Sequence, residues 1–213
     1  MKTDLVIVGA GGHGLSTYEL ALSTGKFRVV GFLDDTKQVG TKVVNDCSVI
    51  GNIAIDFHES SVTMKIAMGL AGEISMRKRL SLLNEFEKSN YEFPTLIHPS
   101  AQISNLADIA QGAQIHALTI IGINAKIGRH SVINSGVIVE HGAEILESCS
   151  ISPGSVLCGN VAIGKSVFIG ANSTILPGIK IGDFSIIGAG SLVNRNLEPN
   201  KTYYGVPARE SKN

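Results

Sequence analysis

A period of six runs through the second half of the chain. Every sixth residue from Ile97 to Val193 is isoleucine, leucine or valine, without an interruption. Two positions before these residues, from Ala107 to Ser173, the side chain is always small or β-branched. Neither an α-helix, with its period of 3.6, nor a single strand, with its period of 2, produces this pattern. It predicts a parallel β-helix with three faces, in which each face takes six residues.

The repeat also predicts where the side chains point. We expect each aliphatic residue to face inward and to stack on its equivalent one turn away, because parallel strands lie about 4.8 Å apart. The small residues belong near the corners, where a bulky side chain has no room. Glycine follows the inward residue in several Ile-Gly pairs, and there it is expected to adopt a backbone conformation closed to other residues: Gly122, Gly128, Gly164, Gly170, Gly182 and Gly188.

The first 93 residues lack this repeat and alternate between strand and helix patterns. Such alternation indicates a small parallel α/β sheet. The pattern predicts strands at 5–8, 28–33 and 62–68, a helix from Leu15 to Thr24, and a further helix around Met76–Leu80. The chain is therefore expected to contain a Rossmann-like domain over residues 1–93 and a β-helix domain with a C-terminal tail over residues 94–213.

A glycine-rich segment, Gly9 to Gly14, follows the first predicted strand and matches the GxGxxG fingerprint. Glycines there let a phosphate approach the backbone, and the N-terminus of the next helix offers free N–H groups. Three interpretations fit: a dinucleotide such as NAD, a nucleoside diphosphate attached to a sugar, or a purely structural turn. We favour the nucleotide sugar, because the rest of the chain is a β-helix and holds no second α/β domain for hydride transfer.

Charge and cysteine content exclude several classes of function. Eighteen basic residues balance eighteen acidic ones, so the sequence carries no electrostatic footprint for nucleic acid or an anionic membrane. The apolar run near the N-terminus is too short for a signal peptide or a membrane span. The three cysteines have no metal-type spacing, and no cluster of histidine, cysteine and carboxylate predicts a metal site. A cytoplasmic protein with reduced thiols is expected.

Both halves together resemble the sugar O- and N-acyltransferases of the PglD and NeuD type, and are most similar to the bacillosamine-pathway UDP-4-amino-sugar N-acetyltransferases. The resemblance covers nearly the whole chain. It rests on Gly9–Gly14, Phe32–Asp35, Ile97–Ala101, the spacing from Asn134 to His141, Gly159–Gly164 and Gly205–Ala208.

The resemblance implies a left-handed coil, a homotrimer, and active sites between neighbouring prisms. It assigns the general base to His141 and a catalytic role to Asn134, seven residues before it, and the chemistry agrees for His141 because imidazole titrates near neutral pH. Acetyl-CoA is then the co-substrate, with its pantetheine arm near Ser150, Ala171 and Ala189. The contacts to the nucleotide-linked amino sugar fall on Gly11, Gly12, His13, Asp34, Asp35 and Gly69.

Two positions depart from the family pattern. Gly142 stands where the family often has a carboxylate after the catalytic histidine, and Ser150 replaces a second histidine on the CoA side. Glu140 is a poor substitute for that carboxylate, since adjacent side chains of a strand point to opposite faces. The remaining histidines considered lack this context and are expected to be surface or structural residues: His58, His98, His116 and His130.

The sequence therefore predicts an N-acetyltransferase that moves acetyl directly from acetyl-CoA to the amine of a nucleotide-linked 4-amino-dideoxy sugar. UDP is the favoured nucleotide. Two alternatives remain: O-acetylation of a sialic-acid-type sugar, which needs no nucleotide site, and a non-catalytic sensor of a nucleotide sugar or NAD. The loss of the carboxylate after His141 motivates the second alternative.

Overall fold

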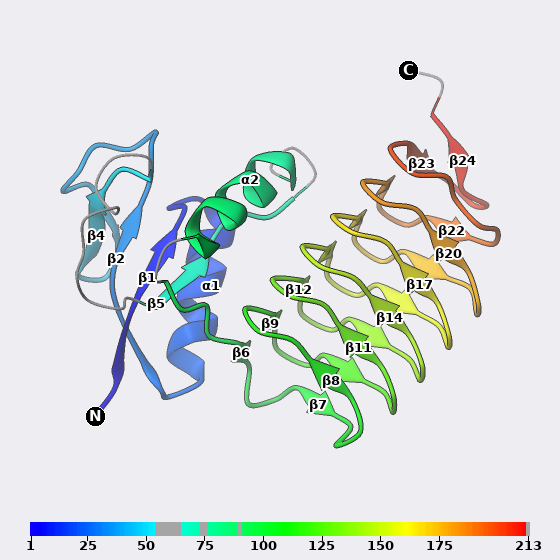
Figure 1. Cartoon of the computed structure of the whole chain (residues 1–213), viewed down its shortest axis with the longest axis horizontal. Coiled ribbons are helices and arrows are strands. Elements are labelled where there is room, and N and C mark those ends of the chain that lie inside the picture. The colour runs from blue at the N-terminus through cyan, green and yellow to red at the C-terminus, as the bar shows by residue number, and fades with distance from the viewer. Residues whose placement is uncertain (54–64, 73–75, 89–90, 212–213) are drawn as a thin grey trace.

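The computed structural model of the chain describes residues 1–53, 65–72, 76–88 and 91–211. Two parts follow one another along the chain: a parallel sheet with two helices, and a β-helix that rises away from it in successive triangular turns (Figure 1). In this described part, no helix has the length and apolar character needed to cross a membrane.

The N-terminal sheet contains five strands in the order β3-β4-β2-β1-β5. Their bounds are β1 Thr3–Val8, β2 Phe27–Leu33, β3 Lys42–Val44, β4 Cys47–Gly51 and β5 Lys65–Met68. The central strand β1 runs parallel to β2 on one side and to β5 on the other. It is buried on both faces, as a central parallel strand should be: Leu5 and Ile7 pack in one core cluster, Val6 and Val8 in the other.

Two helices cover this sheet from opposite sides. Helix α1 (Gly12–Ser23) contributes Leu20 to the cluster that contains Leu5 and Ile7, whereas α2 (Met76–Glu87) contributes Leu83 to the cluster that contains Val6 and Val8. The alternation of strand side chains between faces thus places one helix on each side.

The sequence-based boundaries need three corrections. Helix α1 begins at Gly12 and not at Leu15, since its first turn is formed by the glycine-rich segment itself. The antiparallel hairpin of β3 and β4 was not predicted, because its strands are short and half-exposed. Of the predicted strand 62–68, residues 65–68 are a strand and residues 62–64 lie outside the described residues, as does His58.

Three sheets form the walls of the β-helix. They are built from parallel two-residue strands, except for the three-residue β23 and the antiparallel β24 at the end of one sheet. We call them the covered face, the apolar face and the charged face. The covered face contains β6 Leu96–Ile97, β9 Gln114–Ile115, β12 Val132–Ile133, β15 Ser150–Ile151, β18 Phe168–Ile169, β21 Ile186–Ile187, β23 Thr202–Tyr204 and, antiparallel at its end, β24 Arg209–Glu210.

The apolar face contains β7 Gln102–Ile103, β10 Ile120–Ile121, β13 Ile138–Val139, β16 Val156–Leu157, β19 Thr174–Ile175 and β22 Leu192–Val193. The charged face contains β8 Asp108–Ile109, β11 Lys126–Ile127, β14 Glu144–Ile145, β17 Ala162–Ile163 and β20 Lys180–Ile181. One turn takes eighteen residues, so that Ile127 pairs with Ile145.

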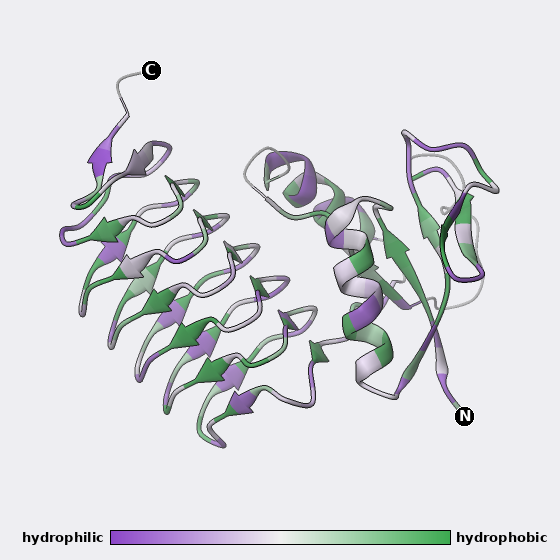
Figure 2. Cartoon of the chain, turned by 180° about the vertical axis from the view of Figure 1, so that it is seen from behind, coloured by the Kyte–Doolittle hydropathy of each residue, from purple (hydrophilic) through white to green (hydrophobic). Residues whose placement is uncertain are grey.

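The predicted inward residues form the core of the β-helix. Ile115, Ile151 and Val193 are completely buried, and Figure 2 shows hydrophobic residues recurring at equivalent places on successive turns. Ile97, the first of the series, is 38% exposed because no turn lies beneath it. The small residues point inward as well, and their hydroxyls tie the turns together: Ser131, Ser155 and Ser173 each donate to the carbonyl fifteen residues on, at 2.8 to 2.9 Å.

The glycines of the Ile-Gly pairs were predicted to adopt a backbone conformation closed to other residues, and this prediction was wrong. None of the six has a positive φ. They are needed because the next turn is too close: a Cβ on Gly128 would lie 2.4 Å from the carbonyl carbon of Leu146, and one on Gly170 would lie 2.5 Å from Ala189 N. The positive φ falls two residues later, at every sixth residue from Gly112 to Gly190, where the chain turns each corner.

Buried polar contacts join the two parts of the chain. The guanidinium of Arg79, completely buried, donates to the backbone carbonyls of His130 and Ser148 and to the Ser148 hydroxyl. On the other side, the Gln114 amide donates to the carbonyl of Met68 at 2.7 Å, and the Thr17 hydroxyl donates to the Gln114 amide oxygen. These bonds give hydrogen-bond partners to polar groups that are buried between the two parts.

Candidate active site

The glycine-rich segment lies at the point where the strand order of the sheet reverses. The chain passes from β1 to β2 on one side, and β5 lies on the other side of β1. In open parallel sheets the crevice at the carboxyl ends of the strands beside such a point is where ligands bind. Gly9 follows β1, Asp34 follows β2 and Gly69 follows β5, so all three come together at this edge.

Two glycines of the segment face open space. A Cβ on Gly11 or on Gly12 would meet no atom within 4 Å, and neither residue has a positive φ. Nothing in the described protein therefore requires glycine there, whereas the close approach of a ligand to the backbone would require it. Gly11 is the N-cap of α1, no side chain caps the helix, and its first turn has no acidic residue. The free N–H groups and the positive end of the helix dipole suit a phosphate.

Three other glycines are explained by packing. A Cβ on Gly14 would lie 2.1 Å from the carbonyl oxygen of Gly9, and one on Gly69 would lie 2.7 Å from the same oxygen. Gly9 itself has a φ of +105°. These glycines let α1 and the ends of β1 and β5 approach closely. The packing explains why residue 69 is a glycine. A contact between Gly69 and a ligand stays a prediction.

The two aspartates after β2 have different surroundings. Asp34 accepts bonds from Ala10 N, Thr36 N, Thr36 Oγ1 and Lys37 N at 2.6 to 3.1 Å. Burial raises the pKa of this carboxyl, but the bonds from Thr36, Ala10 and Lys37 outweigh it, and the net pKa is lowered. Asp34 therefore holds the glycine loop in place, and its oxygens are already engaged.

Asp35 is the more available carboxylate. Its Oδ1 accepts from Ile53 N at 2.9 Å, and its Oδ2 lies 3.5 Å from the Lys78 ammonium. Its side chain is 34% exposed, so Oδ2 can accept from a base N–H or a ribose hydroxyl. Of the two predicted aspartates, Asp35 is the better placed for a ligand.

Lys37 is a residue of this site that sequence reasoning missed. Its ammonium donates to the carbonyl of Ala10 at 2.6 Å and so lies directly beside the open glycines. A lysine in a polar turn carries no distinctive sequence signal. Only the folding of the turn after β2 against the loop after β1 brings this positive charge to the helix N-terminus.

His13 and His116 face each other where the two domains meet. Their ring centroids lie 5.9 Å apart, and the Nε2 atoms of both are buried without a hydrogen-bond partner among the described residues. Burial lowers the pKa of His13 to about 3 and that of His116 to about 4; His116 adds to the first effect and His98 to the second. Both rings are therefore neutral at pH 7. His116 is buried and not at the surface, and its structural role stays a prediction.

His141 lies at the corner between the apolar and charged faces. The residue follows β13 and is exposed. Its ring rests on Gly159 of the next turn, where a Cβ would come within 2.5 Å of Nε2 and Cε1. The neighbouring Glu140 accepts only a long bond from the His141 backbone N–H, at 3.4 Å, and no bond to the ring. His141 is thus an open imidazole supported from one side.

Gly142 has a backbone conformation that favours glycine. Its φ is +64°, and a Cβ would lie 2.3 Å from the Asn160 amide oxygen. It occupies the left-handed corner position of its turn, where a side chain costs energy. Equivalent corners do carry side chains, such as Leu118 and Phe184, so this backbone favours glycine but does not by itself account for the departure from the family pattern.

Asn134, Ala171 and Ala189 share the other edge of the apolar face, at the corner with the covered face. The Asn134 amide donates to the carbonyl of Ile151 at 2.8 Å, so in one chain it fastens this corner to the next turn. Ala189 is exposed, and Gly190 N donates to the carbonyl of Ala171. Their small side chains leave this edge open.

The structure does not bring Ser150 to this edge. Ser150 occupies an outward position of the covered face and is only 2% exposed, because the N-terminal domain packs over that face. The predicted contact of Ser150 with the CoA arm therefore stays a prediction, and its buried position does not support it. Of the cysteines, Cys149 is completely buried, and burial raises its pKa to about 12. In the described part of the chain, no three metal-binding side chains gather at one point.

Two family models match the chain. Residues 4–84 match the PglD N-terminal domain, and residues 160–195 match the bacterial transferase hexapeptide repeats. No curated protein matches the sequence in a search of such proteins.

Solved structures match almost the whole chain. The first is a histidine-to-asparagine mutant of perosamine N-acetyltransferase from Caulobacter crescentus in complex with CoA and GDP-perosamine, at 27% identity and a TM-score of 0.88, covering 99% of this chain and 97% of that one. The second is the acetyltransferase domain of PglB from Neisseria gonorrhoeae in complex with acetyl coenzyme A, at 28% identity and 0.89, covering 99% and 100%.

A third match is partial. A mutant of AntD, an N-acyltransferase from Bacillus cereus in complex with dTDP and coenzyme A, has 25% identity and a TM-score of 0.53, and covers 61% of this chain and 87% of that chain. Fold and comparisons together define the class: this is an acetyl-CoA-dependent acyltransferase built on a left-handed parallel β-helix behind an α/β domain. Within that class, the match of residues 4–84 to the PglD N-terminal domain and of residues 160–195 to the hexapeptide repeats makes the chain similar to sugar acyltransferases of the PglD kind.

Proposed function

We propose that this protein transfers acetyl from acetyl-CoA to the amino group of a nucleotide-linked 4-amino-dideoxy sugar, with UDP as the favoured nucleotide. The observation that carries the proposal is the likeness over 99% of the chain to an N-acetyltransferase in complex with both CoA and GDP-perosamine. An acyl donor and a nucleotide-linked amino sugar thus occupy the same architecture there. In this chain, the β-helix would bind the acyl donor and the glycine loop would bind the nucleotide-linked amino sugar.

The proposed acceptor site begins at the glycine loop. The pyrophosphate rests on Gly11, Gly12 and the N-terminus of α1, with the Lys37 ammonium beside it. Asp35 accepts from the base or ribose. The sugar then extends from His13 toward the β-helix, since the ring of His13 already contacts that of His116 across the domain boundary. This arrangement explains why an α/β domain without catalytic side chains precedes the β-helix.

The donor site requires more than one copy of the chain. His141 lies on one edge of the apolar face, and Ala171 and Ala189 lie on the other. Within one chain the whole width of that face separates them. A homotrimer in which this face turns toward the threefold axis brings the His141 edge of one subunit against the alanine edge of the next.

The three faces differ in a way that supports this assembly. Outward residues of the apolar face include Ile120, which is 46% exposed, and exposed aliphatic residues border it: Leu106, Leu118, Ile123 and Leu176. The charged face instead presents residues such as Lys126 and Glu144, which pair at 3.8 Å. Since the covered face lies under the N-terminal domain, only the apolar face exposes a large hydrophobic patch of the kind that marks interfaces.

In the proposed reaction, His141 acts as general base. The sugar nitrogen attacks the thioester carbonyl carbon while the imidazole takes its proton, and backbone N–H groups stabilise the oxyanion. The C–S bond then breaks, and the proton passes from the imidazolium to the CoA thiolate. Transfer is direct, because burial raises the pKa of Cys149 to about 12 and also raises the pKa of the half-buried Cys158, so neither thiol is a suitable nucleophile.

Replacing His141 tests this role. His141→Asn keeps the size of the side chain and removes the base, so we expect kcat to fall by about 10²- to 10⁴-fold. The assay is thiol release from acetyl-CoA with UDP-, dTDP- and GDP-linked 4-amino sugars, and His98→Asn is the control. If the His141 variant stays within a few-fold of the wild type while its oligomeric state is unchanged, His141 is not the base.

The same assay separates the alternatives. Acetylation of a sialic-acid-type sugar without any nucleotide would favour O-acetylation, and no thiol release with any acceptor would favour a sensor. Thermal melting with UDP, dTDP and GDP identifies the preferred nucleotide as the one that raises the melting temperature most, since a ligand that binds only the folded state raises the melting temperature.

A further inference from the structure

The alanine edge of the apolar face continues into the last turn of the β-helix. Ile187 pairs with Tyr203, so Gly188, which directly precedes Ala189, is followed one turn on by Tyr204. A Cβ on Gly188 would lie 2.8 Å from the Tyr204 Cβ. Tyr204 therefore stands at the end of this edge, one turn beyond Ala189.

The direction of the acyl donor along this edge follows from the proposed function. The acceptor is expected at the glycine loop and at the contact of His13 with His116, so the acetyl group belongs near the early turns, beside the N-terminal domain (Figure 1). The other end of the donor then runs toward the late turns. Ala171 and Tyr204 are two turns apart, which is about 10 Å. The arm of CoA has about as many bonds as four extended residues, which reach roughly 14 Å, so Tyr204 lies where the arm ends and the adenosine phosphates begin.

Tyr204 is exposed but anchored. The residue is 51% exposed, and its phenol oxygen lies 3.1 Å from Ser211 Oγ. The loop that follows it is fixed to the turn beneath: the Gly205 carbonyl accepts from Leu192 N at 3.0 Å, and Ala208 N donates to the Leu192 carbonyl at 2.8 Å. An anchored aromatic ring that is open to solvent offers a stacking surface for a base.

A cation stands beside this ring. Arg209 is directly opposite Tyr204 in the antiparallel pair of β23 and β24, so the two side chains project from the same side of the pair and are neighbours. Arg209 is exposed. Its guanidinium donates to the carbonyl of Ala208 at 2.9 Å and forms no ion pair with the described residues.

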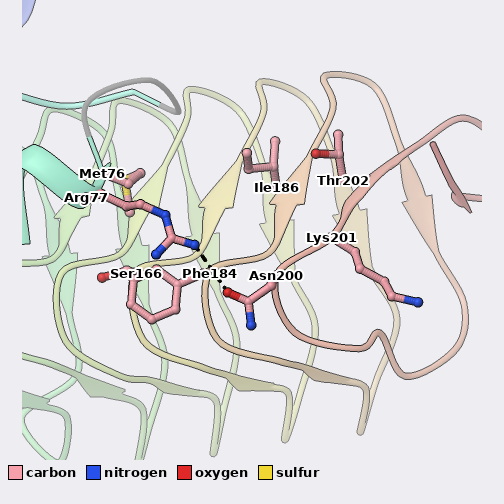
Figure 3. A pocket seen from close by; sticks show the side chains of 8 residues that line it. All are labelled: Met76, Arg77, Ser166, Phe184, Ile186, Asn200, Lys201 and Thr202. Carbon is pink, nitrogen blue, oxygen red and sulfur yellow. Dashed lines mark hydrogen bonds between the residues drawn. The ribbon is translucent and has the colours of Figure 1, made fainter. Parts of the chain in front are cut away.

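The acidic residue next to Arg209 is neutralised by a different cation. Glu210 pairs with Lys201 at 2.9 Å. Figure 3, a view into the neighbouring pocket, shows Lys201 extending away from Arg77. The positive charge of Arg209 is therefore available for an anion, and a guanidinium binds phosphate through two parallel N–H groups.

We propose that Tyr204 and Arg209 bind the adenosine end of acetyl-CoA, an inference that rests on the proposed function. The adenine stacks on the Tyr204 ring, and the Arg209 guanidinium pairs with the 3′-phosphate of the ribose. This end of the donor carries an aromatic base and a phosphate close together, which matches an aromatic ring and a cation on adjacent strands. Neither residue touches the reacting atoms, so both determine the affinity for the donor and not the chemical step.

The test measures the binding of CoA and of 3′-dephospho-CoA to the full chain by isothermal titration calorimetry. Tyr204→Ala should weaken the binding of both probes about tenfold, through the loss of one stacked base. Arg209→Gln should weaken the binding of CoA about tenfold and leave that of 3′-dephospho-CoA unchanged, because only CoA has the phosphate that it pairs with. Arg28→Gln, which removes an exposed arginine of the N-terminal sheet, is the matched control and should bind both probes like the wild type.

A further variant separates stacking from a structural role. Tyr204→Phe keeps the ring and should bind CoA within about threefold of the wild type, and the melting temperatures should stay close to that of the wild type because both residues are exposed. Equal loss of the two probes in Arg209→Gln, or normal binding of CoA by Tyr204→Ala, overturns this inference alone. A wild-type chain that binds no CoA overturns the proposed function as well.

Discussion

Glycine has three separate roles in this chain, and each is decided by its surroundings. Gly142 turns a corner with a φ of +64°. Gly128 and Gly14 make room for backbone atoms that come closer than 3 Å to a Cβ. Gly11 and Gly12 have neither constraint and face open space. The sequence pattern indicated that these glycines are required. For the Ile-Gly pairs it led to the wrong reason, a positive φ, because the sequence does not show whether the backbone of a neighbouring turn lies against the glycine.

Gly159 makes the sharpest prediction for a single residue. Its φ is not positive, so alanine fits the backbone, but the new Cβ would lie 2.5 Å from the His141 ring. Because the imidazole is exposed, it can swing away without unfolding the protein. We expect Gly159→Ala to lower kcat at least tenfold, measured by thiol release, with a melting temperature close to that of the wild type.

The matched control is Gly25→Ala, a change at a turn glycine between α1 and β2 that has open space around it but a φ of +72°. It should lower the melting temperature through backbone strain and leave kcat nearly unchanged. Equal loss of kcat in the two variants would contradict a specific contact between Gly159 and His141.

Elements were predicted to different degrees. The strands of the β-helix follow from the period of six, since each inward aliphatic residue can be buried only if the chain returns every eighteen residues. Strands β1 and β2 and helix α2 were found by their apolar patterns. The hairpin of β3 and β4 was missed, because Lys42–Val44 is an exposed edge strand whose position depends on pairing with β4 more than on its own sequence.

The contact between α1 and the first turns of the β-helix predicts a pH dependence. The folded-state pKa of His116, about 4, and that of His13, about 3, lie below the ordinary value of 6.5 because both rings are buried. The neighbouring His116 and Arg79 lower the pKa of His13 further, His98 lowers that of His116, and Gln114 opposes the shift for His13. Between pH 6.5 and 4 the unfolded chain therefore binds more protons than the folded one, and stability falls as the pH falls.

We expect the melting temperature to drop by roughly 5 °C between pH 7 and pH 5. A drop of this size is consistent with a loss of a few kcal/mol in the free energy of unfolding. His116→Gln should make this drop clearly smaller, whereas His141→Gln, which replaces an exposed histidine, should retain it. A pH profile of His116→Gln identical to that of the wild type would show that this histidine does not titrate on unfolding as described.

On the scale of the whole molecule, the three faces of the β-helix differ in their surroundings and surface chemistry. One is covered by the N-terminal domain, one carries ion pairs, and one exposes aliphatic residues. The period of six does not distinguish these faces, because inward residues are alike on all three. Only the outward residues differ, and their roles depend on which face the N-terminal domain packs against.

The proposed trimer can be tested on the apolar face. Ile120→Asp places a charge among exposed aliphatic side chains, so we expect it to shift the protein from trimer to monomer in analytical ultracentrifugation. Activity should fall together with assembly, because His141 and Ala189 lie on opposite edges of this face. Ala162→Asp, at the outward position of β17 on the charged face, should change neither property.

The prediction would be contradicted by an Ile120 variant that remains a trimer, or by a monomeric variant with full activity. The second result would place the donor site within one chain.

The sequence by itself determined the coil, its length and the domain that precedes it. Local periodicity is sufficient for this, because each turn of a β-helix is held mainly by the turns next to it in the sequence. It also singled out His141 and the glycine loop. Only the tertiary structure decided that Asp34 is engaged while Asp35 is available, that Lys37 reaches the glycine loop, and that Ser150 is buried. These depend on contacts between segments far apart in the chain, which no repeat or motif encodes.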